Sequence, residues 1–355
     1  MNSSAEAATE SISPDHRREV AVLLGLALAL LAAMLLSLVF GRFSIPLTTV
    51  LDVARHHLTG FPLEPEQVQA GVVITSVRLP RICLAVLVGA ALSVSGAAYQ
   101  GLFRNPMVSP DVLGVSSGAG AGASLAILWG WPSLGIQALA FAFGLGAVTM
   151  VMFVARVVGR GGGNSILILI LAGIVISALF SALGSLVKYL GASDTQLMEM
   201  VLWLLGSLAR TGAWSSVLIV LAALIVGALP LYLLRWKINA MSFGEEEARA
   251  LGVNVGRLRL IIIICATLLT ASAVSLCGLI GWVGLIIPHL SRFLVGPNHR
   301  ILLPTAMLGG GLFMLIADNF ARVIVRGELP IGILTAFIGA PLFIYILCRS
   351  RKDWA

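Results

Sequence analysis

The segment RWKINAMSFGEEEARALGVNVGRLR, from Arg235 to Arg259, is the one long charged and helix-forming stretch between strongly apolar runs of this chain. Two helices that pack side by side can be joined by a loop of a few residues, so folding alone does not require such an insert. A capped helix exposed to water between two apolar runs therefore indicates a contact surface for a soluble partner protein. A solvated connector without a partner is the alternative.

The residues of this segment predict two short helices. Ser242 and Glu245 fit a capping box, in which each side chain accepts a hydrogen bond from a free backbone amide at a helix start. Three consecutive glutamates begin at Glu245, where the positive end of the helix dipole favours negative charge. Glu245 and Arg249 lie four residues apart and can pair. Gly252 predicts a left-handed helix end, and Asn254 predicts a cap for the second helix.

The composition is that of a membrane protein. Hydrophobic residues make up 59% of the chain and charged residues 11%, and the mean hydropathy is +1.01. Soluble globular chains have about 25% charged residues, so we predict an all-α polytopic membrane protein. A spanning helix needs about 20 mostly apolar residues. A short eighth run and a break at Gly278 leave nine spans as an alternative, but we count ten apolar runs, at 20–41, 74–103, 112–130, 134–155, 165–189, 213–234, 258–277, 279–295, 301–323 and 331–348.

The distribution of positive charge predicts an orientation for these spans. With both termini in the cytoplasm, 15 of the 23 lysines and arginines fall in inner segments and 8 in outer segments, as the positive-inside rule requires. The net charge of +7 then reflects orientation, and it needs no nucleic-acid partner. We predict a cytoplasmic tail at 1–19, one transmembrane domain at 20–349 with charged helices at about 241–257, and a second cytoplasmic tail at 350–355.

Two outer segments are predicted beside the spans. Residues 42–73 form a loop with a short helix at about 50–58, where His56 and His57 are expected to be solvated and not to bind a metal. Residues 194–210 are too short to span and predict a re-entrant or interfacial helix, which needs protein or a water-filled cavity beside it. This second segment is a candidate gate.

The apolar runs are rich in small residues, which let helices in a membrane approach closely. The stretch GVSSGAGAGAS at 114–124 has the composition of a phosphate-binding loop but lacks the Gly-Lys-Ser/Thr ending that would contact phosphate and magnesium. No Walker motif, no cluster of histidines and cysteines and no Ser-His-Asp pattern is present in the sequence. We therefore predict no enzyme activity, no metal site and no cofactor in this chain.

Few ionisable residues lie within the predicted spans. Asp318 is the one carboxylate placed well inside a span, where charge is costly and usually functional. Asp318 and Arg322 are four residues apart, so mutual pairing is the simpler explanation. Arg78, Arg81, Arg322 and Arg326 lie at the outer ends of spans. Their planar guanidinium groups suit recognition of carboxylates on a partner, but snorkelling towards lipid headgroups is equally compatible.

Several longer motifs carry a family resemblance. Together they make residues 70–348 similar to the permease subunits of the iron-chelate (siderophore), haem and cobalamin uptake family of ABC importers, the FecCD-like type II importers. The motifs are RLPR at 78–81, VGAALSVSGAAYQGLFRNPMVSPDVLGVSSGA at 88–119, GEEEARALGVNVGRLR at 244–259, GWVGLIIPHLSR at 281–292, GPNHRILLP at 296–304 and ELPIGILTAFIGAPLF at 328–343.

The resemblance implies a fold and a set of partners. It implies ten spans in an inner-membrane homodimer, or a pair with a sister permease, with the translocation path on the two-fold axis. Two copies of an ABC ATPase subunit, which bind ATP and magnesium, are expected on the cytoplasmic side, and a periplasmic substrate-binding protein is expected outside. By position, it assigns docking of the binding protein to Arg78, Arg81, Arg322 and Arg326, coupling to the ATPase to Gly244, Glu245, Glu246, Glu247, Arg249, Leu251, Gly252 and Val253, and the gate beside the fifth span to Met198, Leu202, Leu205, Gly206 and Ser207.

The resemblance also bears on the cargo. NPMVSPDVLG at 105–114 and the stretch at 235–252 are more similar to ferric-siderophore members than to haem or cobalamin members. We therefore expect import of a ferric-siderophore-type chelate by alternating access, with haem or cobalamin as the alternative. Asn298 departs from the Asp that many relatives carry. A stand-alone secondary transporter is an alternative of another class, although the sparse intramembrane carboxylates argue against proton coupling.

Overall fold

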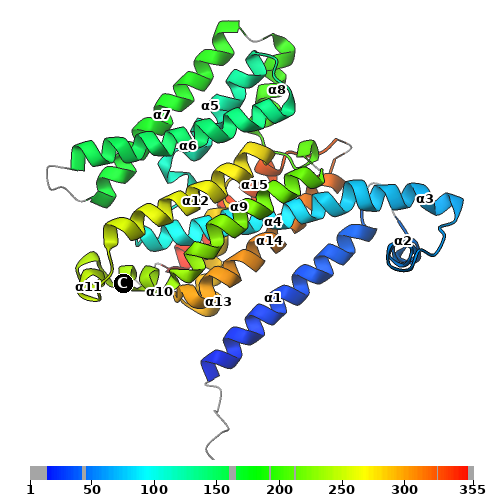
Figure 1. Ribbon diagram of the computed structural model, residues 1–355, viewed down its shortest axis with the longest axis horizontal. Helices are drawn as coiled ribbons and strands as arrows, with labels where there is room; N and C mark the ends of the chain where they lie inside the picture. Colours follow the sequence, from blue (N-terminus) through cyan, green and yellow to red (C-terminus); the bar gives the residue numbers. More distant parts are fainter. Residues whose placement is uncertain are drawn as a thin grey trace, which may run out of the picture.

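The computed structural model describes residues 14–41, 45–159, 165–191, 193–211, 213–325 and 327–350. Within these ranges the chain forms helices and connecting turns, with no β-strand (Figure 1). The predicted all-α fold is confirmed.

Each of the ten predicted apolar runs contains one helix. Seven helices are long and apolar enough to cross a membrane, and three shorter apolar helices complete the set. The break predicted at Gly278 is present, because α12 ends at Cys277 and the next helix begins only at Val283. The ten helices are α1 (Pro14–Val39), α4 (Leu79–Leu102), α5 (Val115–Leu128), α6 (Ser133–Val158), α7 (Ser165–Gly191), α9 (Trp214–Leu233), α12 (Val255–Cys277), α13 (Val283–Val295), α14 (His299–Val323) and α15 (Ile331–Ser350).

Helix α4 lies at the centre of the bundle, and it contacts α14 along its whole length in an antiparallel arrangement. Small residues make this contact possible, as the composition predicts. A β-carbon on Gly89 would lie 2.1 Å from the carbonyl oxygen of Gly310 on α14, and one on Gly96 would lie 1.7 Å from the carbonyl oxygen of Gly284 on α13, so the backbone of α4 touches both helices directly. In lipid such close approach gains van der Waals contact that larger side chains would prevent.

The glycine- and alanine-rich run at 114–124 packs helices and does not form a loop. It makes up most of α5, and a β-carbon on Gly118 would lie 2.5 Å from the carbonyl oxygen of Phe143 on α6. The prediction of helix packing at this run is therefore confirmed.

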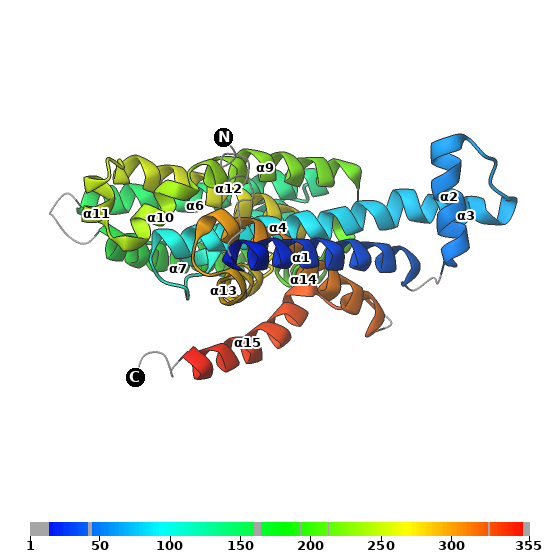
Figure 2. The same cartoon turned by 90° about the horizontal axis from the view of Figure 1, so that it is seen from below.

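The predicted outer loop at 42–73 contains more helix than expected. One helix at 50–58 was predicted; the structure has α2 (Leu47–Thr59) and α3 (Pro65–Val72), which project from one end of the bundle (Figure 2). Helix α3 continues through a π-helical turn, Val73–Arg78, into α4, so that residues 65–102 are one continuous helix. The wide turn precedes Pro80, whose ring cannot follow a regular helical turn and has no amide hydrogen to donate.

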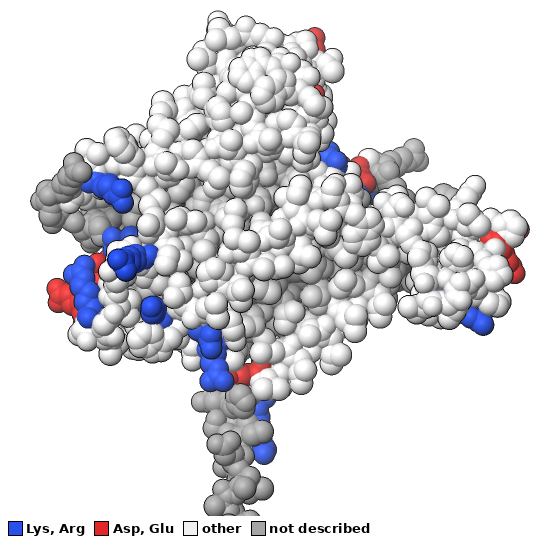
Figure 3. All heavy atoms as spheres, viewed as in Figure 1, with Lys and Arg blue, Asp and Glu red and all other residues white. Residues whose placement is uncertain are grey.

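The two ends of the bundle differ in charge. On the face shown in Figure 3, arginines and lysines gather at the end that holds the segment at 235–259, and the waist carries almost no charge. We call this end the basic end and the other the opposite end, which holds α2, α3 and α8 (Asp194–Leu204). The basic end contains Arg156, Arg235, Lys237, Arg249, Arg257, Arg259, Arg292 and Arg300.

Candidate functional site

Two short helices project from the basic end, α10 (Arg235–Phe243) and α11 (Glu245–Ala250). They meet at Gly244, whose φ of 145° lies in the region that favours glycine. The capping box predicted at Ser242 is wrong. Helix α10 continues through this residue, so the Ser242 hydroxyl donates to the carbonyl of Ile238 one turn earlier, and α11 has no side-chain cap.

The other local predictions for this segment are confirmed. An Arg249 Nη2 lies 3.2 Å from Glu245 Oε2, and Glu245 also pairs with Arg259 on α12. Gly252 is left-handed, with φ of 78°. The Asn254 side chain accepts a hydrogen bond from the amide of Arg257 at 3.0 Å and so caps α12.

The segment combines a fixed base with an exposed face. Ile238, Ala248 and Val253 are buried in the bundle, whereas Phe243 is 78% exposed and Leu251 58% exposed. Glu246 and Glu247 are exposed beside them. Large apolar side chains next to charges on an otherwise polar end are typical of a protein interface.

Helix α10 is also tied to the start of α14. Asn239 Oδ1 accepts a hydrogen bond from the backbone amide of His299 at 2.9 Å. The side-chain Nδ2 of Asn239 donates to Asn298 Oδ1 at 2.8 Å. Asn298 caps α14 by accepting from the amide of Arg300 at 3.0 Å. An asparagine caps a helix as well as an aspartate does, so the departure from the family's Asp keeps the capping interaction.

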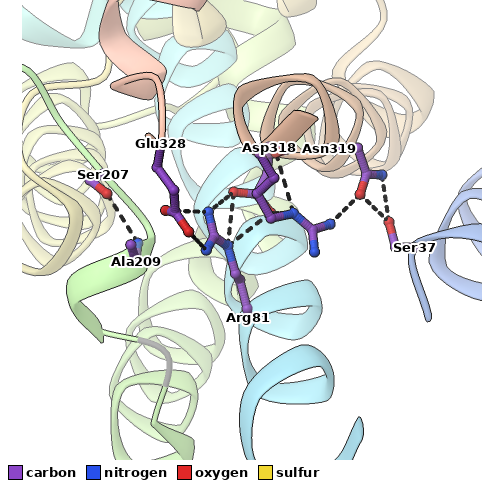
Figure 4. Close-up of polar contacts among 8 residues, drawn as sticks. Ser37, Arg81, Ser207, Ala209, Asp318, Asn319 and Glu328 are labelled. Carbon is purple, nitrogen blue, oxygen red and sulfur yellow. Dashed lines mark hydrogen bonds and ion pairs between the residues drawn. The ribbon is translucent and has the colours of Figure 1, made fainter. Parts of the chain in front are cut away.

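At the opposite end, a buried polar network joins α4 to α14. Arg81 on α4 lies between two carboxylates (Figure 4), with Nη2 2.8 Å from Asp318 and Nη1 2.8 Å from Glu328. Arg322 Nε lies 3.2 Å from Asp318, which confirms the predicted pair four residues apart. Asp318 is fully buried, and both arginines are 8% exposed. Each guanidinium of this network is therefore engaged within the chain.

The other two arginines predicted at this end have different positions. Arg78 is 5% exposed and donates to the carbonyls of Leu38 and Val39, at the end of α1. Arg326 lies outside the described residues. Helix α1 is held a second time, because Ser37 donates to Asn319 on α14 at 2.8 Å.

The predicted gate segment forms α8 and the turn that follows. Met198 and Leu202 are 60% and 45% exposed on one face, whereas Met200 and Trp203 are buried on the other. The turn at Leu205 and Gly206 is fixed by other elements. Gly206 O accepts from the Ile331 amide at 3.0 Å and Leu205 O from the Gly332 amide at 3.1 Å, both at the start of α15, and the Ser207 amide donates to Cys277 O at 2.7 Å.

In the described part of the chain, no three histidines, cysteines or carboxylates are grouped as a metal site would require. The arrangement has a buried polar network at the opposite end, an exposed helical pair at the basic end and an apolar waist. A family model described as the FecCD transport family matches residues 29–349. The chain belongs to this family. It is a multi-pass permease of an ABC importer.

The relatives of this FecCD-family permease are named for several different cargoes. It is 43% identical to the molybdate import system permease protein MolB of Haemophilus influenzae, over 93% of this chain and 96% of MolB. It is 39% identical to a probable iron chelatin transport system permease protein of Helicobacter pylori, over 92% and 98%. The hemin transport system permease protein HmuU of Yersinia pestis is 38% identical, over 79% and 82%.

A solved structure agrees with the architecture. A metal-chelate type ABC transporter in an inward-facing conformation superposes on the permease with a TM-score of 0.82 and 42% identity, covering 93% of this chain and 99% of that one. The transmembrane fold expected from the motifs is thereby confirmed.

Sequence reasoning missed two residues of these sites. Glu328 begins the motif at 328–343 and is the second carboxylate that accepts hydrogen bonds from Arg81. Asn239 lies inside the charged segment and connects α10 to α14. The contacts that place them in these sites reach across 247 residues from Glu328 to Arg81 and 60 residues from Asn239 to His299, so no local pattern could identify them.

Proposed function

We propose that this permease imports a ferric-siderophore-type chelate from a periplasmic binding protein to the cytoplasm by alternating access, driven by a separate ATPase. Two ATPase subunits would bind ATP and magnesium, and this chain would supply the path. The observation that supports this most directly is the exposed α10–α11 pair, which has a buried base and a face with Phe243 and Leu251 open to a partner.

The α10–α11 pair is proposed to fit into a groove of the ATPase. Its movement would reach the bundle through the Asn239–His299 contact to α14 and through the Glu245–Arg259 pair to α12. The residues assigned to this coupling are Gly244, Glu245, Glu246, Glu247, Arg249, Leu251, Gly252 and Val253.

The basic end is proposed to face the cytoplasm of a bacterial inner membrane. The gathering of arginines and lysines at one end of an uncharged waist supports this orientation (Figure 3). The same placement puts α10 and α11 where a cytoplasmic ATPase can reach them, and it puts both chain termini in the cytoplasm.

The opposite end is proposed to receive the binding protein. The family resemblance assigns Arg78, Arg81, Arg322 and Arg326 to this contact. Because Arg81 is buried and paired with two carboxylates, a partner can reach it only by replacing one of them. Glu328 is the most exposed member of the network, at 30% of its side chain. We propose that a carboxylate of the binding protein reaches Arg81 by displacing Glu328.

A second copy, or a sister permease, is proposed to pack against the faces of α7 and α15. Tyr189 on α7 is 87% exposed and Phe337 on α15 is 74% exposed, and α15 stands away from the bundle (Figure 2). The path would then run between the two copies, beside Met198, Leu202, Leu205, Gly206 and Ser207.

The five named gate residues carry no charge, which supports a cargo whose charge is enclosed by its own ligand, as in a ferric chelate. The relatives named for iron chelatin and hemin agree with this choice. Molybdate is the second candidate cargo, because the relative named for molybdate is 43% identical over 93% of the chain. Cobalamin is a third, from a relative 38% identical.

The test is uptake into proteoliposomes that hold the permease with the ATPase that co-purifies from its native membrane. We expect ATP-dependent uptake of a ferric siderophore delivered by the binding protein, and none with ADP. Uptake of molybdate alone would replace the cargo and keep the importer. Uphill accumulation by the permease without any ATPase would overturn the importer itself.

A further inference from the structure

Two adjoining cavities lie between α6, α9, α12 and the segment that follows α8. Gln137 and Leu276 line both cavities, so the two are direct neighbours. Their volumes are about 420 Å³ and 320 Å³. Helix α12 packs against both α6 and α9, and the three helices can be followed next to one another in Figure 1.

The larger cavity is apolar. Phe141 on α6, Ile219 and Val226 on α9 and Leu268 on α12 line it, and no charged residue does. Ile219 is 45% exposed and Val226 is 59% exposed. A groove of this composition, at the waist of a membrane protein, offers a surface to a hydrocarbon chain.

The smaller cavity has a different character. Arg210 and Glu199 both line it, together with the indole rings of Trp131 and Trp203. Burial lowers the pKa of Arg210, and the nearby carboxylate of Glu199 opposes that shift. The cavity therefore presents one cation and one anion together with two tryptophans, a residue type that is enriched at membrane–water interfaces.

We propose that these two neighbouring cavities together bind a zwitterionic aminophospholipid, with its phosphate at Arg210, its primary ammonium at Glu199 and one acyl chain in the apolar groove. The guanidinium donates to phosphate oxygens. A primary ammonium has three hydrogens to donate to a carboxylate, whereas the quaternary ammonium of a choline lipid has none. An anionic lipid without an amine would leave the Glu199 carboxylate facing its phosphate.

The position of the site gives the lipid a place in the transport cycle. Glu199 and Trp203 belong to α8, the helix that also carries the exposed Met198 and Leu202. A bound headgroup would therefore contact α8 directly, next to the gate residues. Lipid binding itself does not depend on the proposed cargo or on the ATPase.

The test is native mass spectrometry of the full-length permease in detergent, titrated with phosphatidylethanolamine, phosphatidylcholine or phosphatidylglycerol of the same acyl chains. We expect phosphatidylethanolamine to bind about fivefold more tightly than phosphatidylcholine, the factor for one partly exposed ion pair. Glu199→Gln should remove this preference, and Arg210→Gln should weaken both lipids. Soluble phosphoethanolamine, which lacks chains, should bind at least tenfold more weakly than the lipid.

Matched variants separate the site from general surface charge. Glu66→Gln and Arg55→Gln change exposed charges at the same end of the molecule, on α3 and α2, and should leave all affinities unchanged. Equal binding of the ethanolamine and choline lipids by the unmodified permease would overturn the proposal. So would a preference that survives Glu199→Gln, or a phosphoethanolamine affinity equal to that of the lipid, which would indicate a headgroup site without a chain.

Discussion

Arg81 on α4 and Asp318 on α14 form a buried ion pair, with 2.8 Å between Nη2 and Oδ1. Asp318 also pairs with Arg322, so one fully buried carboxylate compensates two guanidinium groups. A buried charge without its partner is far more costly than a buried pair. The pair therefore fixes the relative position of α4 and α14 at the opposite end of the bundle.

Asp318→Asn should destabilise the permease strongly. It leaves the charges of Arg81 and Arg322 buried, with the partly exposed Glu328 as the carboxylate that still pairs with Arg81, which costs about 3 kcal/mol. Tryptophan fluorescence during thermal unfolding in detergent measures the change. The matched variant Asp194→Asn alters an exposed carboxylate and should shift the free energy of unfolding by no more than about 0.5 kcal/mol. An equally small shift for both variants would contradict a structural role for Asp318.

Gly96→Ala should also destabilise the fold. The added methyl would lie 1.7 Å from the Gly284 carbonyl oxygen, so α4 and α13 would have to separate. Overpacking of this kind costs about 2 kcal/mol. Gly146→Ala on α6 is the control, because its β-carbon has no neighbour within 4 Å. The same unfolding measurement compares them, and a neutral Gly96→Ala would show that these helices are not in backbone contact.

Glu328→Gln should increase the affinity of the binding protein, if a docking carboxylate competes for Arg81. Removing the internal competitor should tighten docking about threefold at low salt, as expected for one partly exposed ion pair. The gain should shrink as ionic strength rises. Biolayer interferometry across a salt series measures it. Weaker docking by Glu328→Gln would instead assign this carboxylate a direct role in the contact.

Glu246→Arg combined with Phe243→Ser should uncouple the permease from its ATPase. Both side chains are exposed on the α10–α11 face, so the fold should be unaffected and the change should fall on the interface. We expect at least a tenfold loss of substrate-stimulated ATP hydrolysis in the assembled complex, equivalent to about 1.4 kcal/mol of contact energy.

A matched control for this pair lies at the other end of the molecule. Glu66→Arg on α3 reverses an exposed charge far from α10 and α11. It should leave ATP hydrolysis unchanged. Full coupling in the double variant would remove α10 and α11 as the ATPase contact.

Features that depend on neighbours in the chain could be predicted from the sequence. The ten apolar runs, the break at Gly278, the Glu245–Arg249 pair and the Asn254 cap each involve residues within one helix or turn. Ser242 shows the limit of such patterns. A capping box needs a helix to begin there, but α10 extends one residue further and Gly244 makes the turn.

Contacts between distant segments could not be predicted in the same way. Arg81 and Asp318 are 237 residues apart, and Arg81 and Glu328 are 247 apart. Their pairing follows from the packing of α4 against α14, which no local pattern encodes. The arginines therefore looked like free recognition groups at the ends of spans, whereas folding buries Arg78, Arg81 and Arg322.

Helix α14 runs without a break from the basic end of the permease to the opposite end, so a movement of one of its ends is transmitted to the other. Its base is held by Asn239 on α10, and Asp318 lies 19 residues further on, about 28 Å away at 1.5 Å per residue. Tilting this rod by about 5° around its base would carry Asp318 sideways by about 2.5 Å. That displacement is close to the 2.8 Å that separates Asp318 from Arg81. A small tilt of α14 about its base at the basic end would therefore be enough to break this ion pair at the opposite end.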